Sequence, residues 1–133
     1  MTLHDPPPRP LRVADPAAAR DLFAALAEEA VEVVAFVYLD RAQRVLGMRH
    51  LRSRSDWALE LPIRAVAADA LAFDAAAVVM AHNHPSGDPA PSAADREATR
   101  LLARTLAALD VRLLDHLVVA RRGVASFRAL GLL

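Results

Sequence analysis

The sequence predicts a single α/β (α+β) domain in which helices flank a mixed β-sheet. Its 133 residues suit one domain, and hydrophobic residues, at 55%, are numerous enough for a core without disulfides. Valine-rich runs typical of strands also alternate with segments that have helical spacing. We expect residues 16–133 to form this domain and the proline-rich residues 1–15 to form an extended arm.

The first half of the domain contains one expected helix followed by strands. Asp15 and Pro16 are suited to the N-cap and the first helical position, so a helix should begin there. Runs of valines and aromatic residues then indicate a hairpin. The expected elements are a helix over 16–30, strands over 31–39 and 44–51 joined by a turn at 40–43, a loop over 52–56, and an alternating segment over 57–61 that fits a third strand.

The second half alternates helices and strands. Pro62 opens a helix, and a short apolar run after it is consistent with a buried strand. Three prolines and one glycine between residues 83 and 91 predict a loop. The expected elements are helices over 63–73 and 92–109, strands over 75–81, 111–120 and 124–127, and a turn at 121–123.

Composition excludes several kinds of protein. The chain has no cysteine, which rules out thiolate zinc sites, disulfides and cysteine nucleophiles. The formal net charge is +0, which argues against strong autonomous binding to nucleic acid. No secretion signal and no long apolar span is recognisable, so we expect a cytoplasmic protein without a membrane partner.

The residues that could carry chemistry lie around the end of the expected strand 75–81. His82 and His84 are two residues apart, so on an extended chain both imidazoles leave the same face. A loop constrained by proline and glycine leads to a helix start at Ser92, with Asp95 one turn into the helix. Two histidines and one aspartate would leave a fourth tetrahedral position for water, the open arrangement of a catalytic zinc site.

Each part of this pattern also has an ordinary structural interpretation. Ser92 and Asp95 fit an acidic helix capping box. A His-x-His pair is compatible with surface residues, and Pro85-Ser86-Gly87 is compatible with a simple turn. The metal site is favoured by the ordered combination of these residues rather than by any one of them.

The same string of residues resembles a known family. His82-x-His84, seven residues, Ser92, two residues and Asp95 are similar to the metal motif of JAMM (JAB/MPN-plus) metalloproteases. His-Asn-His-Pro-Ser-Gly-Asp-Pro from residue 82, with the segments 114–119 and 126–133, resembles the RadC branch. The resemblance covers nearly the whole chain from about residue 16, and it implies the curved mixed sheet of the JAB/MPN, cytidine deaminase-like fold.

The resemblance implies a function for each site residue. Zn²⁺ would be held by His82, His84 and Asp95, and Ser92 would donate a hydrogen bond to the oxyanion. Glu32 matches the glutamate that acts as general acid and base. The implied reaction is hydrolysis of a peptide or isopeptide bond in a peptide or protein-conjugate substrate. A homodimer is compatible with this interpretation.

Several alternatives remain open at this stage. Glu28 and Glu29 compete with Glu32, although we expect both at the exposed end of the first helix, and Glu32 itself fits a solvated residue at a strand start. His116, in an apolar strand, fits a hydrogen-bonded core histidine better than a residue supporting a metal ligand. Trp57 fits the core or an interface better than a substrate platform.

The alternative function is a non-catalytic RadC-type accessory or interaction module in DNA repair or mobile-element biology. The metal site would then be structural or vestigial. A nuclease fits less well, since one zinc held by two histidines and an aspartate lacks the acidic two-metal clamp common in phosphodiester cleavage.

Overall fold

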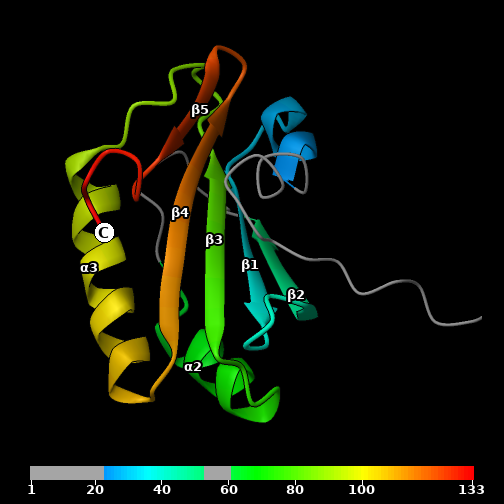
Figure 1. Cartoon of the computed structure of the whole chain (residues 1–133). Coiled ribbons are helices and arrows are strands. Elements are labelled where there is room, and N and C mark those ends of the chain that lie inside the picture. The colour runs from blue at the N-terminus through cyan, green and yellow to red at the C-terminus, as the bar shows by residue number, and fades with distance from the viewer. Residues whose placement is uncertain (1–22, 53–60) are drawn as a thin grey trace, which may run out of the picture.

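The computed structural model describes residues 23–52 and 61–133, which form a five-stranded mixed sheet with helices on both faces (Figure 1). The strand order across the sheet is β2-β1-β3-β4-β5. In chain order the elements are η1 (Ala24–Glu28), β1 (Val33–Leu39), β2 (Val45–Arg52), α2 (Ile63–Ala72), β3 (Ala77–Asn83), α3 (Ala93–Ala108), β4 (Arg112–Ala120) and β5 (Gly123–Ser126).

Strand pairing brings three distant chain segments to one end of the sheet. β1 is antiparallel to both β2 and β3, whereas β3 and β4 are parallel, with α3 as the crossover helix. The start of β1 therefore lies beside the end of β3, where Val34 pairs with His82. His82 in turn pairs with Val118 near the end of β4.

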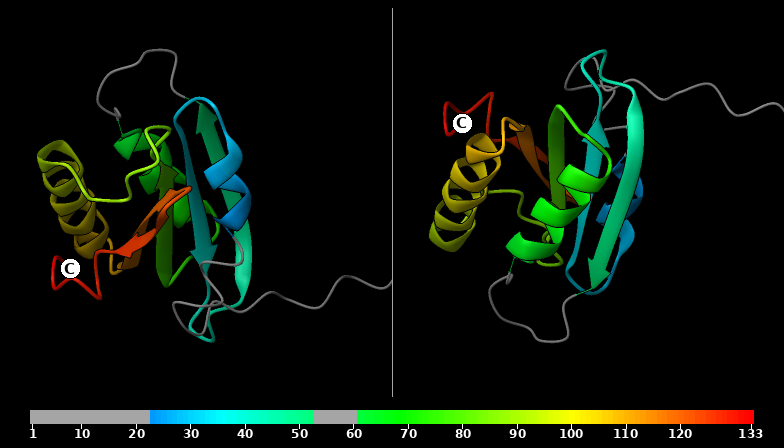
Figure 2. Two further views of the ribbon diagram at one scale, coloured as in Figure 1. Left: turned by 90° about the horizontal axis from the view of Figure 1, so that it is seen from above. Right: turned by 90° about the horizontal axis from the view of Figure 1, so that it is seen from below.

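Helices lie on both faces of the sheet, as Figure 2 shows from two directions, and an apolar layer lies on each face. On one face η1 packs through Phe23 and Leu26 against β1, β3 and β4. On the other face α2 and α3 pack against alternate residues of the same strands, such as Phe36 and Met80. β1 is buried along its whole length, which explains its unbroken run of apolar residues.

The predicted fold class is confirmed, and several element boundaries differ from the prediction, three of them at the end of the sheet where β1 begins. The described part of the first helix is a 3₁₀ helix that ends at Glu28, not at Ala30. β1 begins at Val33 rather than at Val31. β3 does not end at Ala81 but continues through Asn83, because the ladder with β4 runs on to the end of the strand. The expected loop over 83–91 therefore begins one residue later.

Some sequence predictions concern residues outside the described ranges. These are the arm over 1–15, the start of the first helix, most of the loop over 52–56 and of the segment over 57–61, and Trp57. Within the described ranges, Arg52 belongs to β2 and Leu61 is not part of a strand.

A polar cluster of Tyr38, Arg49 and Asp69 fastens the far end of β1 to β2 and α2. The Tyr38 hydroxyl donates to Asp69 Oδ2 at 2.8 Å. Arg49 donates to both carboxylate oxygens, with Nη2 2.8 Å from Oδ1 and Nε on Oδ2. The hydrogen bonds from Arg49 hold the pKa of Asp69 below its usual value, against the effect of burial. Donors thus meet both acceptor atoms of this carboxylate.

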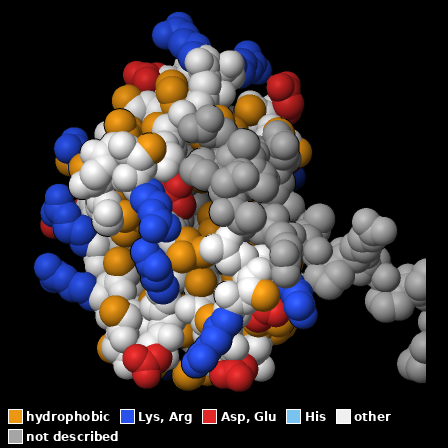
Figure 3. All heavy atoms as spheres, viewed as in Figure 1, with side chains coloured by type: hydrophobic (Ala, Val, Ile, Leu, Met, Phe, Trp, Pro, Cys, Tyr) orange, Lys and Arg blue, Asp and Glu red, His pale blue; other side chains and the backbone are white. Residues whose placement is uncertain are grey.

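The surface carries charges of both signs. Arginine and acidic side chains are interspersed with apolar groups on the face seen in Figure 3. No helix in the described ranges is both long enough and apolar enough to span a membrane.

Candidate metal site

The two histidines are presented by the end of β3. Side chains alternate along a strand, so His82 follows Val78 and Met80 onto the face covered by α3. Asn83 turns to the opposite face, and His84 comes after the strand end with its backbone N–H bonded to Val119 O. The strand therefore brings both imidazoles to the side where α3 begins, as the spacing predicted.

The histidines converge on one point together with Asp95. The Nε2 atoms of His82 and His84 lie 3.0 Å apart. Asp95 on α3 places Oδ1 3.3 Å from His82 Nε2 and Oδ2 3.1 Å from His84 Nε2. Ligands about 2.0–2.1 Å from a tetrahedral zinc ion are about 3.3 Å from one another. The separations within this cluster are thus those of atoms able to share one metal ion.

The hydrogen bond of His84 leaves its converging nitrogen available. Its Nδ1 lies 2.9 Å from the backbone oxygen of Asp88, which can only accept a hydrogen bond. Asp95 Oδ2 can also accept a hydrogen bond from Nε2, at 3.1 Å. With a metal ion on Nε2, the ring proton of His84 would reside on Nδ1, where Asp88 O accepts it. A backbone carbonyl that fixes the tautomer in this way is a usual partner of a metal-binding histidine.

Glu32, in the segment just before β1, lies close to the two imidazoles. Its Oε1 is 3.7 Å from His82 Nε2, and its side chain is 18% exposed. Burial raises the pKa of Glu32, against the opposing effect of His82 and His84. Glu32, His82 and His84 together offer three ligand atoms within 4.8 Å of one another, a group that could hold a metal ion.

Comparison of the sequence with known proteins gives a family that agrees with this fold and this cluster. Residues 13–132 match the family model described as RadC-like JAB domain. The chain belongs to this family. It is 47% identical over 106 residues to a UPF0758 protein of Pseudomonas fluorescens, covering 78% of this chain and 47% of the relative.

Other UPF0758 relatives give the same result. One from Methylibium petroleiphilum is 48% identical over 109 residues, covering 81% of this chain and 49% of the relative. One from Vibrio cholerae is 46% identical over 95 residues, covering 71% and 60%. The chain spans about half the length of most of the relatives it matches. The predicted RadC resemblance is therefore confirmed at the level of the family.

In this RadC-like domain Asn83 holds the chain segment that carries Glu32. Its Oδ1 accepts the backbone N–H of Val33 at 2.6 Å. Its Nδ2 donates to the backbone oxygens of Val31 at 2.8 Å and Glu29 at 3.2 Å. The residues on both sides of Glu32 are thereby bonded to the residue between the two histidines. Sequence analysis missed this role, although a residue between two histidines of one strand face must point to the other face.

Ser92 and Asp95 form the capping box that was one of the two interpretations of their spacing. Ser92 Oγ accepts the Asp95 N–H at 3.0 Å, and Asp95 Oδ2 accepts the Ser92 N–H at 2.8 Å. This arrangement fixes the Asp95 carboxylate beside the imidazoles. Although burial opposes it, the contacts of its two oxygens with the His82 and His84 imidazoles hold the pKa of Asp95 well below its usual range. The role of Ser92 as an oxyanion donor remains a prediction, and its capping bond leaves its own proton free for that purpose.

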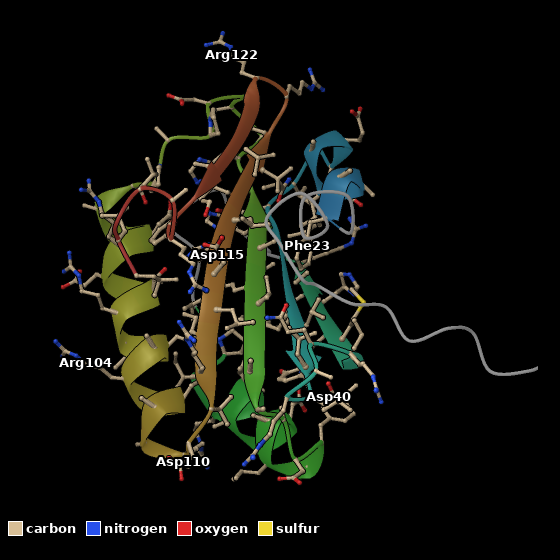
Figure 4. The ribbon with its side chains drawn as sticks, viewed as in Figure 1. Phe23, Asp40, Arg104, Asp110, Asp115 and Arg122 are labelled. Atoms are coloured by element: carbon tan, nitrogen blue, oxygen red, sulfur yellow. The ribbon has the colours of Figure 1, made fainter. Side chains whose placement is uncertain are left out.

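Of the glutamates in the described ranges, Glu32 groups with the two histidines, whereas Glu28 and Glu29 do not. Glu29 forms an exposed ion pair with Arg52 at 3.2 Å, and Glu28 ends η1. His116 is a buried, hydrogen-bonded histidine, as expected, and one of its partners is His82 at 2.6 Å. The carboxylate of its neighbour Asp115, labelled in Figure 4, accepts from Ser126 Oγ and from the backbone N–H groups of His116 and Arg128.

Proposed function

We propose that this domain is a zinc-dependent metallohydrolase that cleaves a peptide or isopeptide bond. The observation that carries the proposal is the approach of two imidazole Nε2 atoms to 3.0 Å, with the Asp95 carboxylate beside both. Two nitrogens at this distance share either a proton or a metal ion, because two lone pairs alone would repel. A metal ion would also satisfy the Asp95 carboxylate beside both nitrogens. Imidazole and carboxylate ligands without thiolate suit zinc.

The residues around this point have distinct tasks in the proposed reaction. When bound, zinc would act as a Lewis acid that lowers the pKa of a water molecule to about 7 and polarises the scissile carbonyl. Glu32 would accept a proton from the attacking water and later give it to the leaving amine. Its raised pKa makes the Glu32 carboxylate a stronger base than an exposed glutamate, which suits this transfer. The Ser92 hydroxyl would donate a hydrogen bond to the developing oxyanion.

The substrate class follows from the family resemblance and from the kind of site. A carboxylate that returns a proton to the leaving group suits an amine leaving group, as in peptide and isopeptide bonds. We therefore propose a peptide or protein-conjugate substrate, with zinc held by His82, His84 and Asp95.

The test compares Glu32→Gln with Glu29→Gln in zinc-reconstituted protein. Fluorogenic libraries of linear peptides and of peptides branched through lysine side chains provide the substrates. We expect wild type and Glu29→Gln to cleave the same sequences, because Glu29 pairs with Arg52 on the surface. Loss of the general base should slow Glu32→Gln by about 10²–10⁴-fold. Equal rates for Glu32→Gln and wild type on a substrate that both cleave would contradict the role of Glu32 as general base. Wild-type protein that binds no zinc, or that binds zinc and cleaves none of the peptides, would contradict the proposed hydrolase.

A further inference from the structure

A buried chain of contacts links α3 to the back of His82. Thr99 Oγ1 lies 2.6 Å from the backbone oxygen of Asp95 and 2.6 Å from His116 Nδ1. His116 Nε2 lies 2.6 Å from His82 Nδ1. The three side chains are between 0% and 1% exposed. The proposed reaction uses neither Thr99 nor His116, so their contacts need another explanation.

The direction of each hydrogen bond in this chain follows from its first member. A carbonyl oxygen only accepts, so the single hydroxyl proton of Thr99 is donated to Asp95 O. Thr99 must then accept from His116, which places a proton on His116 Nδ1. Neutral imidazole carries one N–H, and His116 Nε2 therefore accepts from His82 Nδ1–H.

The environment of His116 favours its neutral form. The ring is completely buried, and its two nitrogens face a hydroxyl and another imidazole. Its plane stacks on Phe127 at a centroid distance of 4.4 Å. Burial without an ion-pair partner on the ring disfavours imidazolium. The chain of donors and acceptors can thus be completed in one way.

We propose that Thr99 and His116 are positioning residues that hold His82 in the tautomer with its proton on Nδ1 and its lone pair on Nε2. This inference rests on the proposed function, because the lone pair matters as a metal ligand. The backbone oxygen of Asp88 does the same for His84 directly. For His82 the carbonyl that fixes the tautomer is that of Asp95, and it acts through the side chains of Thr99 and His116.

The consequence of removing the Thr99 hydroxyl is specific. His116 would lose the acceptor for its Nδ1 proton and could adopt its other tautomer, donating from Nε2 to His82 Nδ1. His82 would then carry its proton on Nε2, the atom that faces His84 at 3.0 Å. The proton would occupy the coordination position, and zinc would have to displace it.

Three substitutions on α3 separate this effect from general damage to the helix. Thr99→Val is nearly isosteric but lacks the hydroxyl, whereas Thr99→Ser keeps it. Thr105→Val is the matched control, because Thr105 makes the same bond to the carbonyl four residues earlier, at 2.9 Å to Leu101 O, on the exposed side. Zinc affinity is measured by competition with a chromophoric chelator. We expect Thr99→Val to bind zinc about 10–100-fold more weakly, and the other two variants to bind it as wild type does.

Nitrogen-15 NMR of the imidazole rings in metal-free protein, at mildly alkaline pH, gives the second readout. We expect the His82 proton on Nδ1 in wild type and Thr99→Ser, and on Nε2 in a substantial population of Thr99→Val. A merely structural role would lower the unfolding free energy of Thr99→Val without moving the tautomer or the zinc affinity.

The inference is overturned if wild-type His82 carries its proton on Nε2, or if Thr99→Val matches wild type in both measurements. Wild-type protein that binds no zinc would instead remove the proposed function. The tautomer would still be read from the metal-free spectra, so the two failures are distinguishable.

Discussion

The two ends of β1 each carry a buried or half-buried cluster of ionisable groups, and the clusters differ in how their atoms meet. At the Tyr38 end, donors from Tyr38 and Arg49 meet both oxygens of Asp69. At the Glu32 end, the His82 and His84 Nε2 atoms face each other and a carboxylate, while their Nδ1 atoms are bonded elsewhere. The first cluster is complete without a ligand, whereas we propose that a bound metal ion completes the second.

This difference shows which observation indicates a functional site. Charge and burial are present at both ends, and in both clusters polar neighbours hold the pKa of an aspartate below its usual value against the effect of burial. Only the arrangement of donors and acceptors separates them. Neighbouring acceptor atoms are unfavourable in a folded protein unless something bound offsets their repulsion. Four substitutions or conditions test this comparison.

The largest effect is expected for Asp95→Asn. The amide keeps an oxygen that can accept the Ser92 N–H and so preserves the helix cap, but the negative charge is lost. Partners behind a ligand are each worth about 10–100-fold in metal affinity, so loss of a direct ligand should weaken zinc binding by more than about 100-fold. A chelator competition titration measures this.

Asp110→Asn provides the control for Asp95→Asn. Asp110 lies at the other end of α3, as Figure 4 shows, and its φ of 58° is one that asparagine tolerates. We expect its zinc affinity to equal that of wild type. If Asp95→Asn also bound zinc as wild type does, Asp95 would not be a ligand.

The next effect concerns Asn83→Asp. The carboxylate can still accept the Val33 N–H, but it cannot donate to the carbonyls of Glu29 and Val31. Leaving these groups unpaired should cost about 2–4 kcal/mol in the free energy of unfolding, measured by urea denaturation. Turnover should fall more than zinc affinity, since Glu32 is the displaced group. A stability loss below about 0.5 kcal/mol would show that Asn83 does not hold this segment.

Zinc affinity should also depend on pH. The hydrogen bond to Asp95 raises the pKa of His84 above its ordinary 6.5. In metal-free protein the corresponding stability is present below pH 6.5 and is lost as the pH rises through the higher folded-state pKa. Zinc must displace this proton, so its affinity should increase over the same range, by up to about tenfold per pH unit. Isothermal titration with zinc at several pH values measures the affinity. An affinity that does not change with pH would contradict a zinc site that includes His84.

The smallest effect on zinc affinity and stability is expected for a substitution in the cluster of Tyr38, Arg49 and Asp69. Tyr38→Phe removes one of the donors to Asp69 and should lower the free energy of unfolding by about 1 kcal/mol. Zinc affinity should not change, because Tyr38 lies at the opposite end of β1. A change in zinc affinity would mean that the two clusters are coupled, which would undermine the comparison between them.

Local sequence patterns were sufficient for most of the fold. Periodicity and turn residues placed the hairpin around Asp40, the helices beginning near Ile63 and Ala93, and the last two strands. The end of β3 was missed because the apolar run stops before His82. This strand continues as buried polar residues, and only the ladder with β4 shows that His82 and Asn83 are part of it.

The candidate site was predictable where its residues are close in sequence. The spacing of His82, His84 and Asp95 reflects one strand end, one loop and one helix start, and Glu32 was found through the family resemblance. Asn83 and Thr99 were not found, because their contacts connect residues 50 and 17 positions apart. No local pattern reports such contacts.

The proposed site holds one zinc ion between the two facing imidazoles. Crystals of zinc-loaded protein measured on both sides of the zinc absorption edge test it directly. The account predicts one anomalous peak per chain, about 2.0–2.1 Å from His82 Nε2 and His84 Nε2 and in contact with Asp95, with Glu32 facing its fourth position. Zinc bound elsewhere, with the His82 and His84 nitrogens still 3.0 Å apart and uncoordinated, would contradict it.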